Sequence, residues 1–156
     1  DSAMTSVMLG TSLVAQRAHD IQRGFHLLAS RPGVDRNAIR GAAQGSAAPA
    51  MLHAAAAGVP FAGLLLDSMV ASYRSITETP IHHAVFESIV PGAIRHYDLP
   101  GLIAMLGSKP VLLVDPASPL SAPLANPEAL RLPANARLLM RGIEEPPARA
   151  YAGWLK

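Results

Sequence analysis

Apolar positions near the start of the chain repeat with the period of a helix. The apolar residues that share one face between positions 12 and 30 are Val14, Ala18, Ile21, Phe25 and Leu28. Their spacings of four, three, four and three predict a helix over 12–30 with one apolar face, which we expect to lie on a sheet. Pro32 and Gly33 follow as helix breakers.

Continuous apolar runs of strand length dominate the rest of the chain. The predicted strands are residues 37–41, 59–68, 110–116 and 136–142. The predicted helices between and after them are residues 46–57, 98–109 and 146–156. Residues 69–98 predict a loop with short helices. Strands that alternate with helices predict an α/β fold with a parallel sheet, in one domain that covers residues 1–156.

Polar residues stand at the carboxyl ends of these strands, the edge where parallel α/β sheets place their chemistry. The strand-end positions are 42–45, Asp67 with Ser68, 115–118 and 141–145. Asp67 and Asp115 each follow a buried run. A carboxylate at such a place either belongs to a site or caps the loop that follows.

Residues 41–45, Gly-Ala-Ala-Gln-Gly, lie between a predicted strand and a predicted helix. Two glycines that flank three residues at such a turn provide the room in which many hydrolases present a catalytic serine. The central residue is Ala43, which has no hydroxyl. We therefore expect a strained turn at Ala43 that carries no nucleophile.

Several segments in order resemble the C-terminal half of an α/β-hydrolase, of the bacterial acetyl-xylan-esterase or dienelactone-hydrolase type. They are GVDRNAIRGAAQGS, LLLDSMVASYRSITETPIH, VPGAIRHYDLPGL and KPVLLVDP, and the similarity covers roughly residues 10–120. The resemblance places Ala43 at the nucleophile position, makes Asp115 the candidate acid and makes the backbone N–H of Gln44 a candidate oxyanion donor. The histidine of such a triad comes last in the chain, yet no histidine follows His96.

Two functions follow from this incomplete triad. One is a non-catalytic domain of esterase lineage that binds a carbohydrate or acyl-ester ligand in the old cleft, or acts as a scaffold. The alternative is an active carboxylic-ester hydrolase, which uses Ser46 or Ser68 as a displaced nucleophile or has its site completed by an N-terminal segment. The residues expected around the cleft are Asp67, Tyr73, Arg74, Arg95 and His96.

Histidines are concentrated between residues 82 and 96. A metal site could be assembled from His82, His83, Glu87, His96 and Asp98. Adjacent histidines on a helix point in different directions, so we expect ordinary packing here and predict neither a metal nor a cofactor. His19, His26 and His53 fall in predicted helices, where we expect structural roles, and Trp154 is expected to be a packing anchor.

The amino-acid composition excludes several classes of partner and of chemistry. The formal charge is only +2, aromatic residues make up 4% and no basic stripe occurs, so we expect no nucleic-acid partner. Cysteine is absent, which excludes disulfides and thiolate chemistry. The apolar run at 54–66 is shorter than the roughly 20 residues that span a bilayer, and residues 1–17 do not resemble a signal peptide. We expect a soluble chain and leave its compartment open.

A half of a hydrolase fold would leave one sheet edge without its neighbouring strands. Because a free parallel edge promotes association, we expect a homo-oligomer or association with an N-terminal half.

Overall fold

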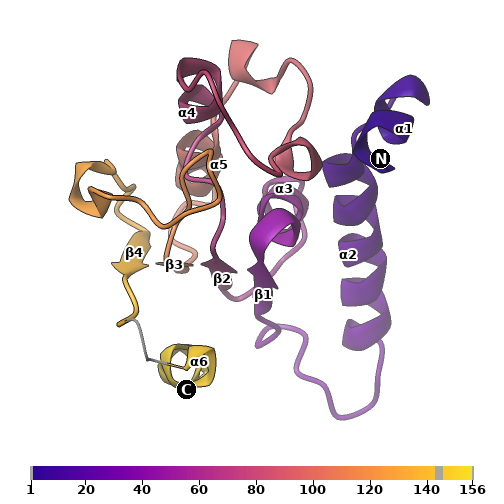
Figure 1. Cartoon of the computed structure of the whole chain (residues 1–156). Helices are drawn as coiled ribbons and strands as arrows, with labels where there is room; N and C mark the ends of the chain where they lie inside the picture. The colour runs from indigo at the N-terminus through magenta and orange to yellow at the C-terminus, as the bar shows by residue number, and fades with distance from the viewer. Residues whose placement is uncertain (1, 143–145, 156) are drawn as a thin grey trace.

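The computed structural model describes residues 2–142 and 146–155. At its centre is a parallel sheet whose strand order equals the chain order (Figure 1). The strands are β1 (Gly41–Gln44), β2 (Leu64–Asp67), β3 (Val111–Val114) and β4 (Ala136–Leu139). They pair in register, with Ala43 opposite Leu66 and Leu66 opposite Leu113. The predicted α/β class and the parallel sheet are confirmed, and the four carboxyl ends meet at one edge.

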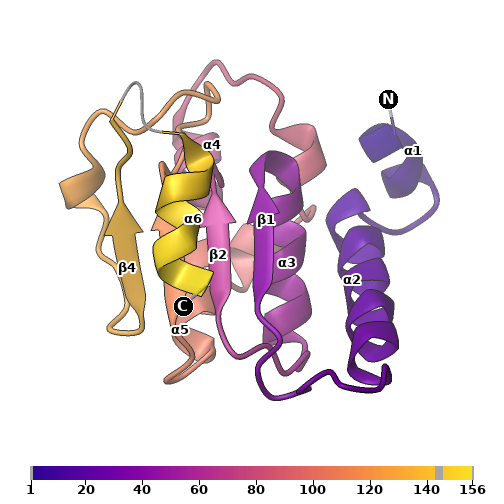
Figure 2. The same ribbon diagram turned by 90° about the horizontal axis from the view of Figure 1, so that it is seen from below.

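Helices cover both faces of this sheet (Figures 1 and 2). The helices on one face are α3 (Ala48–Ala56), α4 (Tyr73–Glu78) and α5 (Leu99–Met105), and α6 (Pro147–Leu155) lies across the other. Two further helices, α1 (Ser2–Met8) and α2 (Leu13–Ala29), precede β1. Short 3-10 helices occur at Gly45–Ala47, Phe86–Ser88, Ala93–Arg95 and Pro127–Ala129. None of the described helices is long and apolar enough to cross a membrane.

The second strand is the centre of the core. All four of its residues are buried, including Asp67. Leu64 and Leu66 pack in one cluster with Leu52 of α3 and Ile103 of α5. This double burial is what the uninterrupted apolar run predicts. The edge strands are less covered, since Ala42 in β1 and Arg137 in β4 are exposed.

The helix predicted over 12–30 is confirmed as α2. Ser12 caps it, because its Oγ accepts a hydrogen bond from the Ala15 N–H at 3.1 Å. Val14 and Phe25 are buried as expected, but Leu28 is exposed. The expectation that this helix lies on the sheet is wrong, since its main packing partner is α3.

The first strand lies further along the chain than predicted. Residues 37–41 were expected to form it, yet β1 is Gly41–Gln44. Gly41 fits the start of this strand because a Cβ there would lie 2.7 Å from Met51 Sδ and 2.9 Å from Leu64 Cδ2. A strand beginning at Gly41 extends through the segment that was expected to turn.

Candidate functional site

The carboxyl edge of the sheet brings together the polar residues that follow β2, β3 and β4. Asp67 pairs with Val114 in the sheet, so Ser68 and Asp115 follow side by side. Both have left-handed backbone, with φ of 51° and 42°. Such a conformation costs a non-glycine residue on the order of 1–3 kcal/mol and is concentrated at functional positions. The strain marks this edge as the candidate site.

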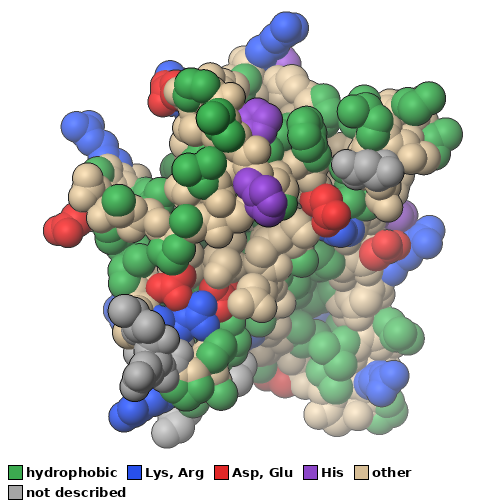
Figure 3. Space-filling view, in the orientation of Figure 1, with side chains coloured by type: hydrophobic (Ala, Val, Ile, Leu, Met, Phe, Trp, Pro, Cys, Tyr) green, Lys and Arg blue, Asp and Glu red, His purple; other side chains and the backbone are tan. Residues whose placement is uncertain are grey.

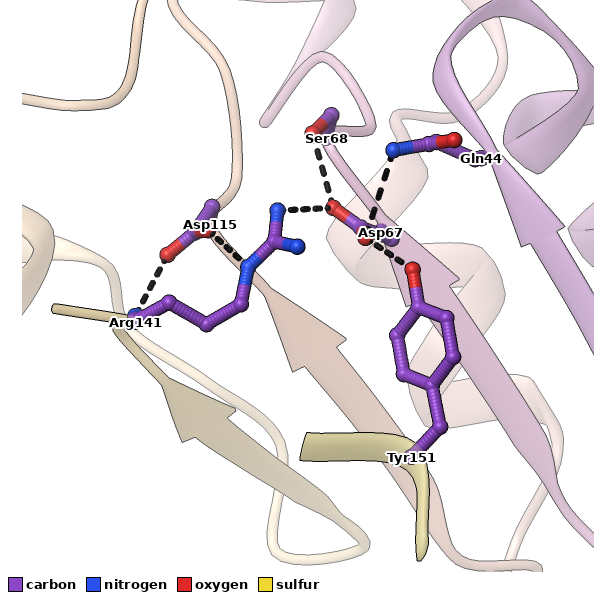
Figure 4. Close-up of polar contacts among 6 residues, drawn as sticks. All are labelled: Gln44, Asp67, Ser68, Asp115, Arg141 and Tyr151. Atoms are coloured by element: carbon purple, nitrogen blue, oxygen red, sulfur yellow. Dashed lines mark hydrogen bonds and ion pairs between the residues drawn. The ribbon is translucent and has the colours of Figure 1, made fainter. Parts of the chain in front are cut away.

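Asp67 is fully buried and is surrounded by donors (Figure 4). Its carboxylate accepts hydrogen bonds from Ser68 Oγ at 2.7 Å and from Gln44 Nε2 at 3.5 Å. The hydroxyl of Tyr151, which α6 contributes, also donates to it. Arg141 Nη2 completes the set with an ion pair at 3.1 Å. The buried carboxylate thus has an ion-pair partner and three further hydrogen-bond donors.

Arg141 joins the two carboxylates of the site. Its Nε lies 2.5 Å from Asp115 Oδ2, and its backbone N–H donates to Asp115 Oδ1 at 2.8 Å. The hydrogen bond to Asp115 raises the pKa of Arg141, and burial partly opposes this. Burial, followed by the hydrogen bond to Asp67, raises the pKa of Tyr151 to about 12. At neutral pH the site therefore contains a guanidinium, a protonated phenol and two acidic side chains.

Among the described residues, this arrangement offers no histidine as a general base. A guanidinium is a donor only and stays protonated in proteins, so Arg141 cannot take a proton from a hydroxyl. Among the described residues, no histidine forms a hydrogen bond with Ser46, Ser68 or either aspartate. Asp115 binds a guanidinium where a serine-histidine-aspartate mechanism would need the acid to bind an imidazole.

The expectation of a strained turn at Ala43 is wrong. Ala43 lies inside β1, and the left-handed residue is Gly45, with φ of 59°. Glycine adopts this conformation without the clash that a Cβ would cause. Gln44, the candidate oxyanion donor, is the last residue of β1 and has extended backbone. The chain therefore turns two residues later than the spacing of the glycines suggested.

Ser46 lies just after this turn, in a small polar cluster. Its Oγ donates to Glu87 Oε2 at 3.0 Å and accepts from Arg17 Nη1 at 3.1 Å. Arg17 Nη2 also forms an ion pair with Glu87 at 2.8 Å. The hydrogen bonds from Arg17 and Ser46 lower the pKa of Glu87, so its carboxylate is a weak base.

A cavity of about 700 Å³ opens above this edge of the sheet. Six of its thirteen lining residues are serines: Ser2, Ser46, Ser68, Ser88, Ser118 and Ser121. Phe86, Val70 and Val85 contribute apolar wall, and Glu87 is the only charged lining residue among those described. The cavity thus offers many neutral hydroxyl donors and acceptors and one compensated charge.

The other residues expected in the cleft lie elsewhere. Tyr73 is buried and its hydroxyl donates to the Ser88 carbonyl at 3.0 Å. Arg74, Arg95 and His96 are exposed and do not line the large cavity. The metal alternative is not supported either, because no three histidine, aspartate or glutamate side chains of the described part of the chain form a group that could hold an ion.

Sequence reasoning missed three participants of the site. Tyr151 lies 84 residues after Asp67, and no local pattern in α6 points to that contact. Arg17 lies in the helix predicted over 12–30, and nothing in that pattern points to its contact with Ser46. Arg141 was expected at a strand end, but its contacts with both aspartates depend on tertiary structure. Residues 143–145, which were expected at the same strand end, lie outside the described residues.

Comparisons with known proteins do not assign the chain to a family. No family model matches the chain, and none of the curated proteins searched matches it. The function is therefore argued from the site.

Proposed function

We propose that this chain is an α/β-hydrolase-like domain of esterase lineage that has lost the triad and binds a neutral polar ligand, a carbohydrate or its acyl ester. The observation that carries the proposal is the serine-lined cavity above a strand-end site whose carboxylates are bridged by Arg141. The chain order of the segments quoted above supports the lineage, and the four-stranded parallel sheet supports an α/β fold in general.

The lining of the cavity favours neutral ligands. Hydroxyl groups both donate and accept hydrogen bonds, as the hydroxyls of a sugar do. Described lining residues include no lysine or arginine, so the lining itself provides no cation for a phosphate or carboxylate. The volume of about 700 Å³ lies within the range typical of small-molecule sites.

Binding of methyl β-D-glucoside, followed by amide chemical shifts, tests this proposal. We expect saturable shifts at residues of the cavity and weaker binding of the anion glucose 6-phosphate. Ser118→Ala removes a hydroxyl from the cavity and should weaken binding about fivefold, the effect of one hydrogen bond of about 1 kcal/mol.

Ser30→Ala is the matched control, since Ser30 ends α2 and bonds only within that helix turn. Tighter binding of glucose 6-phosphate than of methyl glucoside, or no shifts at all, would contradict the proposal.

Ser68 favours the second candidate function, a carboxylic-ester hydrolase. It is strained, it lines the cavity and its Oγ donates to Asp67. Against this, the Asp67 carboxylate is already engaged by Arg141 and Tyr151. Hydrolysis of a short-chain nitrophenyl ester separates the two functions: we expect none in the parent chain or in Ala43→Ser. Activity that is lost in Ser68→Ala or Ser46→Ala would establish the esterase.

A further inference from the structure

A second, smaller hollow lies between α1 and the 3-10 helix Phe86–Ser88. It measures about 70 Å³, and seven of its eight lining residues are apolar. The main walls are formed by Met4, Val7, Leu13, Phe86, Ile89 and Pro91. The one polar lining residue, Ser12, already accepts the hydrogen bond that caps α2. We call this hollow the α1 groove; it offers a ligand only apolar contact.

The α1 groove lies beside the large cavity. Phe86 lines both spaces, so its ring forms a shared wall. Helix α1 borders both as well, with Ser2 at the cavity and Met4 and Val7 at the groove. A ligand that occupies both spaces would have to pass the Phe86 side chain, which lies between the serine-lined cavity and α1.

Three apolar side chains of α1 are exposed, whereas Ala3 is buried. Met4 is 57% exposed and Val7 45% exposed. Figure 3 shows hydrophobic side chains gathered over α1, at the upper right of the molecule. Covering this surface would be favourable, and contiguous exposed apolar surface is typical of a binding surface.

We propose that the ligand is amphiphilic, with its polar head in the serine-lined cavity and a linear alkyl or acyl chain in the α1 groove. This inference rests on the proposed function. The groove favours a chain over a ring, because an apolar cavity that holds benzene measures about 150 Å³, and the groove is about 70 Å³. It therefore holds only the first few methylene groups of the chain.

Calorimetric titration with monomeric methyl, butyl, hexyl and octyl β-D-glucoside tests the inference. Affinity should rise about two- to fourfold per methylene over the first carbons, the upper figure corresponding to about 0.8 kcal/mol for a fully buried methylene. The gain should then flatten as the chain leaves the groove.

Met4→Gln and Met105→Gln form a matched pair, since Met105 is 70% exposed on α5 and lines neither space. Glutamine and methionine have similar helix propensity, so α1 should persist. Met4→Gln should reduce the gain per methylene, and Met105→Gln should leave it intact. Val7→Thr, which replaces a methyl by a hydroxyl, should act like Met4→Gln.

The outcomes separate the two proposals. Binding of methyl glucoside without any gain along the series would overturn the alkyl subsite and leave the cavity as the binding site. A gain that Met4→Gln and Val7→Thr leave unchanged would also overturn it, as would binding only above the micelle concentration. Failure of every glucoside to bind would remove the proposed function itself.

Discussion

Asp67 is the residue on which the interior of this site depends. A carboxylate without exposure is costly unless other groups compensate it, and here the compensation comes from β1, from the segment after β4 and from α6. Removing one partner of a buried ion pair leaves an uncompensated charge, which is worse than having no pair.

Arg141→Met should therefore be strongly destabilising. It leaves Asp67 buried without its cation, and we expect a loss of about 3–5 kcal/mol in the free energy of unfolding, measured by urea denaturation. Asp67→Asn in the same chain should restore part of the loss, because the amide carries no charge. A loss below about 1 kcal/mol, the range of a surface pair, would show that Asp67 is not dependent on Arg141.

His53 gives the fold a pH dependence. Burial lowers its pKa below 6.5, and its Nε2 lies 2.9 Å from the Tyr97 hydroxyl. Because the unfolded chain binds this proton more readily, stability is full above the unfolded pKa and falls as the pH drops toward the folded pKa.

The free energy of unfolding should thus decrease as the pH falls below about 7, and it should decrease less in His53→Gln. His26→Gln, which removes an exposed histidine of α2, is the control variant. Equal pH profiles for all three chains would contradict the assignment to His53.

At the residue scale, the position of a residue relative to a predicted strand indicates where it lies in the fold better than the type of its side chain indicates its contacts. Asp67, Ser68 and Asp115 could be placed at one edge because they stand at the ends of two apolar runs. Arg141 could not be assigned its bridge, since its contacts to Asp67 span 74 residues. Ala43 was placed wrongly because two glycines permit a turn at either end of the segment, and packing at Gly41 decides it.

Elements with many periodic positions were predicted best. Helix α2 follows from its apolar spacing over 17 residues. Helix α1 has only seven residues and was not predicted. The apolar run at 59–68 was longer than β2, because Val59 and Phe61 are buried without belonging to the strand. Buried residues are apolar whether or not they belong to a strand, so the ends of a strand cannot be located from an apolar run alone.

The left-handed turn between β1 and α3 can be tested by comparing a glycine-to-alanine substitution there with the same substitution in a helix. Gly45→Ala should lower the free energy of unfolding by about 1–2 kcal/mol, because a Cβ is unfavourable in left-handed backbone. The expected loss of stability comes from the backbone conformation and not from a steric clash, since no atom beyond the adjacent residues lies within 4 Å of the position that a Cβ would take.

Gly101→Ala in α5 is the matched change with the opposite sign. Gly101 has ordinary helical backbone and open space around it, so alanine should stabilise by about 0.5–1 kcal/mol. Thermal or urea unfolding of both variants gives the comparison. Equal effects at the two glycines would contradict the turn at Gly45.

At the scale of the whole molecule, the sheet ends abruptly at β1. Within the described ranges, β1 pairs only with β2, so the outward backbone groups of its other edge have no strand beside them. Ala42 in this strand is exposed. The expected association through a free edge stays a prediction, and the geometry of β1 gives it a specific location.

Sedimentation at increasing concentration tests association through β1. We expect the parent chain to form a dimer and Ala42→Lys to shift it toward monomer, since lysine on an edge strand opposes pairing with another strand. Ala104→Lys, the same change on the exposed side of α5, should leave the dimer intact. A parent that stays strictly monomeric would contradict the prediction.

The ties to Asp67 have a consequence for synthesis. Arg141 and Tyr151 follow Asp67 by 74 and 84 residues. At roughly 5–20 residues per second, a nascent chain waits roughly 4–15 s between making Asp67 and making Arg141. During that interval β2 carries a charge that only later segments neutralise, so burying it early is unfavourable. Burial of β2 is therefore disfavoured until Arg141 and α6 have been made.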